Sequence, residues 1–137
     1  MNEQEKNFVE AFVVSDSRQR CLTLLASKKG RAKIRLALAH TFTSYLDERY
    51  IYPLDSLPIE VSRKSQAVLK KAGWTPLSLC YVISERSEAD GREMTLSQAE
   101  EYHAHWYGII IVLVPGQVAY YRTEGRDPDY LLFREAL

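Results

Sequence analysis

The chain has 137 residues, of which 46% are hydrophobic and 26% are charged, and its 18 basic residues balance its 18 acidic ones. This composition is ordinary for a globular protein and excludes an intrinsically disordered chain. The zero net charge excludes a global field that would draw the molecule to nucleic acid or membrane. Residues 1–84 nevertheless carry 13 basic and 8 acidic residues, whereas residues 85–137 carry 5 and 10.

The cysteines and the chain start indicate the compartment. Cys21 and Cys80 show no CxxC spacing and are expected to be buried, reduced thiols. The first residues, MNEQEKNF, lack the basic and apolar regions of a signal peptide. No apolar run approaches the roughly 20 residues that a membrane span needs. We therefore expect a cytoplasmic protein that does not associate with membranes.

The first 40 residues are expected to form a helical unit of three helices. Over residues 3–14, apolar side chains recur on one helical face: Phe8, Val9, Phe12 and Val13. The stretch Ser15-Asp16-Ser17 supplies a break and an N-cap for a second helix over 17–27. Gly30 is expected to end or kink this helix, and a third helix follows over 31–40.

Residues 40–58 lose periodicity and are predicted to be a long surface connection. Three tyrosines lie here, and we expect them to lie across the core: Tyr45, Tyr50 and Tyr52. The segment has too little Gly and Ser for a flexible linker, so we expect one domain of 137 residues. Its sheet-containing part is residues 59–137, which begin with a helix over about 62–72. Either Ser62 or Ile59-Glu60 starts this helix, and Gly73 ends it.

A strand is predicted over 77–84, followed by a polar loop over 85–93. The carboxylates of that loop, at Glu85, Glu88 and Asp90, are expected to be solubilising charges. A helix over 96–105 follows, capped by Thr95 or by Ser97, with Glu100 completing a capping box for Ser97. The final segment, 130–134, is predicted to be a short strand or a helical tail.

Residues 108–123, GIIIVLVPGQVAYYRT, predict a hairpin at the centre of the fold. The run Ile109 to Val114 does not alternate with polar residues, which indicates a strand that is covered on both faces. A Pro-Gly pair prefers a type II turn, whose twist fits a tight hairpin poorly. We therefore expect a looser loop or a bulge here. The fold class is α+β: an N-terminal helical unit, then a small antiparallel sheet of about three strands with helices packed on it.

The strongest local charge feature lies in residues 16–40, which hold seven basic residues and one acid, Asp16. The basic residues are Arg18, Arg20, Lys28, Lys29, Arg31, Lys33 and Arg35. Arg31 and Arg35 are i, i+4 neighbours, a like-charge pair that is unfavourable unless a counter-charge lies opposite. Three interpretations remain open: a solvated helical face, a surface for a protein partner or for the chain's own acidic half, and a nucleic-acid contact.

His103 and His105, close to Glu100 and Glu101, raise the question of a metal site. Glu100 with His103 and Glu101 with His105 have helical i, i+3 and i, i+4 spacings, but the two pairs lie on different faces. No third ligand and no HExxH spacing are present, so surface or half-buried histidines are the expectation and no cofactor is predicted. The nine tyrosines are the other feature, and Tyr121 is a candidate partner contact on an outer face of the hairpin.

No catalytic constellation, P-loop or dinucleotide motif occurs in the sequence. The leading hypothesis is therefore a small non-enzymatic binding or regulatory protein. It would bind a protein partner or a second copy through the basic helical face and exposed tyrosines. The first alternative is a nucleic-acid-binding module that uses the basic helices around residues 18–35. The second is a small metal-dependent hydrolase that uses the histidines.

Overall fold

The structure, a computed structural model, describes residues 2–39, 41–104, 107–123 and 128–135. Over these residues the fold is α+β, as predicted, with five α-helices and a six-stranded antiparallel sheet. The helices are α1 Glu3–Phe12, α2 Ser15–Leu25, α3 Lys28–Ala37, α4 Ile59–Lys71 and α5 Leu96–Ala104. The strands are β1 Ile51–Pro53, β2 Leu79–Ser84, β3 Arg92–Thr95, β4 Ile109–Val114, β5 Val118–Arg122 and β6 Tyr130–Phe133. None of the described helices is long and apolar enough to cross a bilayer.

The sheet has the strand order β1-β6-β5-β4-β2-β3, so the prediction of about three strands was wrong. The strands that the sequence did not reveal are β1 and β3, which form the two edges. With three and four residues, they are too short for an alternating pattern to be read. The predicted surface connection over 40–58 therefore contains an edge strand, together with three short 3₁₀ helices, Phe42–Tyr45, Glu48–Tyr50 and Leu54–Ser56.

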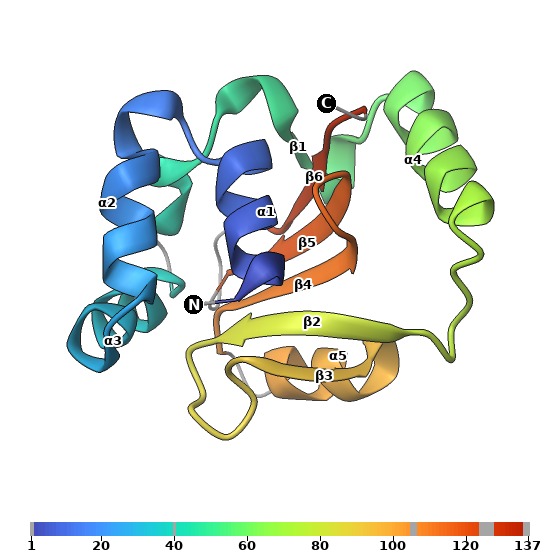
Figure 1. The fold of residues 1–137 in the computed structure, drawn as a ribbon. Helices are drawn as coiled ribbons and strands as arrows, with labels where there is room; N and C mark the ends of the chain where they lie inside the picture. Colours follow the sequence, from blue (N-terminus) through green and yellow to red (C-terminus); the bar gives the residue numbers. More distant parts are fainter. Residues whose placement is uncertain (1, 40, 105–106, 124–127, 136–137) are drawn as a thin grey trace.

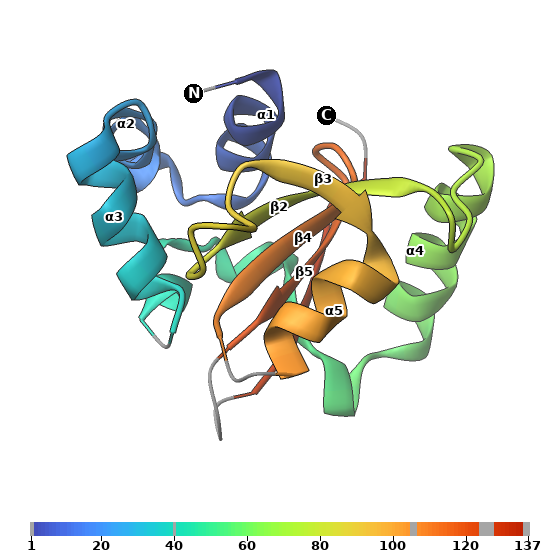
Figure 2. The ribbon, with the colours of Figure 1, turned by 90° about the horizontal axis from the view of Figure 1, so that it is seen from below.

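Strand β4 lies inside the sheet and is buried along its whole length, as its uninterrupted apolar run predicted. Helices cover both faces of the sheet (Figures 1 and 2). On one face, α1, α2 and α3 pack over Ile110 and Val112, and on the other, α4 and α5 pack over Ile109 and Ile111. Successive β4 side chains thus enter two different cores, which explains why none of them is polar.

The β4–β5 connection has the type II turn that Pro-Gly prefers and, of the two predicted alternatives, the bulge and not the looser loop. The Gln117 amide donates to the Val114 carbonyl at 3.0 Å, and Gly116 has φ of 73°, the left-handed value that the third residue of a type II turn requires. The ladder shifts register between Val112 and Val114. The extra residue in β4 corrects the twist mismatch between a type II turn and a hairpin.

The start of α2 differs from the sequence prediction, and the start of α5 agrees with one of its two alternatives, the cap at Thr95. Helix α2 begins at Ser15 itself and has no side-chain cap, so the Ser-Asp-Ser stretch is its first turn and not its N-cap. At α5 the reciprocal capping box joins Thr95 and Gln98 in place of Ser97 and Glu100: the Gln98 amide donates to Thr95 Oγ1, and the Thr95 amide donates to Gln98 Oε1.

Candidate binding surface on the N-terminal helices

The short connection between α2 and α3 determines where the basic side chains lie. Gly30 was predicted to end or kink the second helix, but it lies in the first turn of α3. There its amide donates a hydrogen bond to the Ser27 side chain. A Cβ at this position would lie 2.4 Å from the Leu24 carbonyl oxygen. Glycine therefore allows α3 to start in direct contact with the last turn of α2, and the two helices form one outer layer (Figure 1).

Of the seven basic residues predicted to contact a partner, six form no ion pair with an acidic side chain among the described residues. They are Arg18, Arg20, Lys28, Lys29, Lys33 and Arg35, and we call them the basic face. Arg20 and the three lysines are exposed, while Arg18 and Arg35 are half-buried. Arg18 Nε donates to the Val13 carbonyl at 3.0 Å, which ties the start of α2 to the end of α1.

Lys28 and Lys29 lie in the first turn of α3, not at the C-terminus of the preceding helix. The start of a helix carries the positive end of its dipole, so two lysines there are electrostatically unfavourable. No acidic residue occurs in this first turn to offset them. The start of α3 is thus a concentrated positive surface, which attracts an anionic group from outside the chain.

Leu36 adds an apolar contact to the basic face. Its side chain is 72% exposed. On a helix it is the i+3 neighbour of Lys33, and Lys29 lies one turn before Lys33, so these three side chains share the outer face of α3. A leucine between lysines offers a partner both an apolar contact and charge.

Arg31, the seventh basic residue, belongs to a buried network and not to the basic face. Its guanidinium makes paired hydrogen bonds with Glu5, and it binds Asp90 through Nε at 2.6 Å and Nη2 at 3.1 Å. The Tyr81 hydroxyl donates to Glu5 at 2.5 Å and accepts from the Asn2 amide at 2.9 Å. Arg31, which was predicted to contact a partner, instead pairs with Asp90 of the chain's own acidic half, one of the interpretations left open above. Asp90, which was expected to be a solubilising charge, is the partner of Arg31 in this pair.

Glu5 is the centre of this network and is only 1% exposed. Burial would raise the pKa of its carboxyl, but the hydrogen bonds from Arg31 and Tyr81 and the charge of Arg31 together hold that pKa below its usual value. Burial also raises the pKa of Tyr81, to about 12, so its hydroxyl keeps the proton that it donates. The network therefore locks α1 and α3 to the sheet.

The position of Glu5 on α1 is a sequence signal for this network. Glu5 lies three and four residues before Phe8 and Val9, so it continues the apolar face of α1. A carboxylate on that face needs a buried cationic partner. Arg31, which lies on the side of α3 that faces the core, is the matching cation.

None of the nine tyrosines is exposed, so the prediction of an interface made of exposed tyrosines does not fit the structure. Tyr121 in particular is fully buried, and its hydroxyl donates to the Leu38 carbonyl at 2.8 Å. The prediction that Tyr121 contacts a partner therefore does not fit its position in the core. The expectation that Tyr45, Tyr50 and Tyr52 lie across the core is confirmed, because all three pack against the two apolar clusters.

His103 lies near acidic side chains but not in a metal-binding group. Its Nε2 is 3.2 Å from the Thr123 carbonyl oxygen and 3.7 Å from Asp129 Oδ1. Arg122 pairs with Asp129 and with Glu100, the residue one turn before His103, so both carboxylates are occupied. The other histidine of the prediction, His105, lies outside the described residues. Across the part of the chain that is described, no three His, Cys, Asp or Glu side chains are arranged to hold a metal ion.

Two cysteines are buried, and burial raises the pKa of both thiols, Cys21 to about 11, which leaves them unreactive. The basic face is a cluster of positive charge that no acidic side chain pairs with among the described residues. Comparison with models of known protein families, with curated proteins and with solved structures gives no significant match to this chain.

Proposed function

We propose that this protein is a small non-enzymatic binding protein whose basic face, on α2 and α3, holds an acidic segment of a partner protein. The observation that carries the proposal is the contrast within one charge cluster. Arg31 is neutralised by Glu5 and Asp90, whereas the six residues of the basic face have no acidic partner among the described residues. We further propose that it works in the cytoplasm, where its buried cysteines stay reduced.

Leu36 favours a protein partner over nucleic acid. Phosphates attract lysine and arginine but offer no apolar surface to an exposed leucine beside them. An acidic peptide with an apolar side chain complements both features of α3: its carboxylates lie near Lys29 and Lys33, and its apolar side chain covers Leu36. Nucleic acid is the alternative that the binding test must distinguish.

The test compares two anionic probes, a fluorescent glutamate-rich peptide that contains leucine and a random DNA duplex, at several salt concentrations. The double variant Lys29→Glu with Lys33→Glu should weaken peptide binding at least about tenfold, since like charges replace attractive ones. The matched control is Lys70→Glu with Lys71→Glu, which reverses the charge of two exposed lysines at the end of α4. It changes the net charge by the same amount as the α3 double variant. The control should retain most of the affinity.

Leu36→Ala should weaken peptide binding and leave any duplex binding unchanged. Tighter binding of the duplex than of the peptide, with a steep loss of affinity as salt rises, would replace the proposal by the nucleic-acid alternative. Equal effects of the α3 and α4 charge reversals would mean that only net charge matters, and would contradict a specific basic face.

A further inference from the structure

Strand β3 leaves one edge of the sheet open. It is last in the strand order and pairs with β2 alone. The Val82 carbonyl faces β3, where it accepts from the Gly91 amide, whereas the Thr95 amide turns away from β2 to Gln98 Oε1. The alternation of an antiparallel ladder then directs the amide and carbonyl of Glu93 outward. The opposite edge strand, β1, contains Pro53, which lacks an amide proton and protects that edge. The two edges therefore differ in their capacity to accept another strand.

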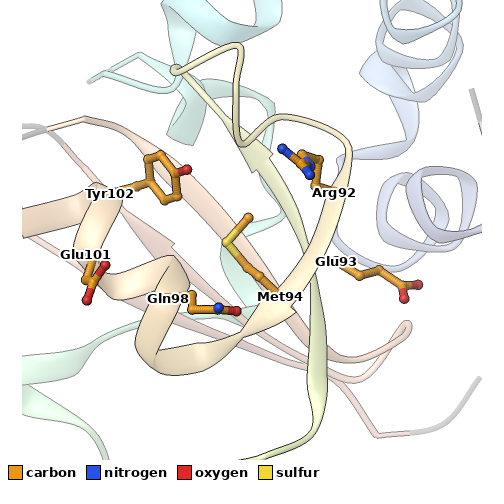
Figure 3. Close-up of a pocket in the computed structure, with 6 residues that line it drawn as sticks. All are labelled: Arg92, Glu93, Met94, Gln98, Glu101 and Tyr102. Atoms are coloured by element: carbon orange, nitrogen blue, oxygen red, sulfur yellow. The ribbon is translucent and has the colours of Figure 1, made fainter.

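A hollow of about 420 Å³ lies beside this open edge, between β3 and α5. Figure 3 shows Met94 at its centre, with Tyr102 and Gln98 reaching towards it from α5. Met94 is buried and Tyr102 is half-buried, so the two form an apolar floor. Arg92, Glu93 and Glu101 are exposed around the rim.

The rim carries net negative charge. Glu93 and Glu101 form no ion pair with any described residue. Arg92 is the one basic residue of the lining, and its Nη1 is held by the Glu88 carbonyl at 3.2 Å. A basic side chain on an incoming segment would complement the two free carboxylates.

We propose that β3 is a second binding site, where an extended segment of a partner protein adds as a seventh strand. Its backbone bonds to the outward amide and carbonyl of Glu93, as in other cases of strand addition. One apolar side chain enters the hollow over Met94 and Tyr102, and a neighbouring basic side chain lies beside Glu93 or Glu101. This site is independent of the basic face and takes a ligand of opposite charge.

A second copy of this chain fits the edge less well than a basic segment does. Two β3 strands from two copies could pair antiparallel. In the register that pairs Arg92 of each copy with Met94 of the other, Glu93 lies directly opposite Glu93 of the other copy. Like charges directly opposite each other in a sheet are destabilising. The edge therefore favours a partner with its own sequence.

The test uses two capped synthetic peptides of alternating lysine and valine, identical except that one carries N-methyl groups on every second residue. Fluorescence polarisation should show that methylation weakens binding about tenfold, because it removes the backbone donors that a strand needs. Glu101→Lys should weaken binding of the unmethylated peptide several-fold, while the control Glu10→Lys, an exposed acid on α1, should not.

Equal affinity of the two peptides, or no binding of either, would overturn the proposal. Equal effects of Glu101→Lys and Glu10→Lys would overturn it too, because binding would then follow net charge alone. A dimer that the unmethylated peptide dissociates in sedimentation velocity would assign the edge to a second copy, and would also rule out the partner segment. Since Glu93, Glu101 and the basic face are all on the surface, melting curves of each variant should match the parent protein.

Discussion

At the scale of single residues, the buried network around Glu5 shows how seven similar basic residues acquire different roles. Arg31 has a side chain only 21% exposed and makes two ion pairs, one to α1 and one to the loop between β2 and β3. A buried pair contributes less to stability than its geometry implies, because both charges lose their hydration. Removing one partner is costly, however, because the other charge is left buried alone.

Arg31→Met should therefore lower the free energy of unfolding by about 3–5 kcal/mol, since Glu5 and Asp90 lose their cation. Urea denaturation at neutral pH measures this change. Arg63→Met is the control: it breaks an ion pair to Glu60 in which both side chains are largely exposed, and should shift the midpoint little. If both variants were equally stable, the network would not lock the helices to the sheet.

The acid side of the stability curve gives a separate prediction for Glu5. Because its pKa in the folded state lies below the model-peptide value of 4.5, its contribution to stability is present above that pH and is lost as the pH falls through the folded pKa. Glu5→Gln should therefore reduce stability at neutral pH and flatten its decline below about pH 4.5. Glu10→Gln, at an exposed site on the same helix, should leave the slope unchanged.

At the scale of elements, periodicity predicted most helices and the central hairpin, because these segments are long or fully buried. It failed at β1 and β3, which are held by pairing with β6 and β2 and not by their own pattern. It also placed Gly30 at the end of a helix, where glycine is common. In the folded chain, glycine at this position serves the close approach of α3 to Leu24, a tertiary contact that no local pattern contains.

Gly30→Ala should consequently destabilise the protein, although alanine is the better helix former by about 1 kcal/mol. The added methyl group would overlap the Leu24 carbonyl, and the resulting shift of α3 should cost about 1–3 kcal/mol. Lys29→Ala in the same turn is the control and should stay within about 0.5 kcal/mol of the parent. A Gly30→Ala protein more stable than the parent would show that the two helices are not held this closely.

At the scale of the whole molecule, the charge imbalance between the two halves of the sequence is partly internal. Arg31 meets Asp90 across the fold, and this pair joins the basic half to the acidic half. The sequence alone identified the basic cluster but not which of its members remain available to a partner. That distinction depends on the helix layer and on Glu5, whose partner is 26 positions away. The open edge at β3 likewise depended on the strand order.

Chemical-shift mapping with the glutamate-rich peptide tests the central claim most directly, because it locates the contact residue by residue. If the basic face on α2 and α3 binds an acidic partner, backbone amides of residues 15–38 should shift on titration, and the shifts should shrink in the Lys29→Glu, Lys33→Glu variant. The chemical shifts of the backbone amides of β3 should not change. Shifts spread evenly over the surface, or centred on α4, would contradict the account.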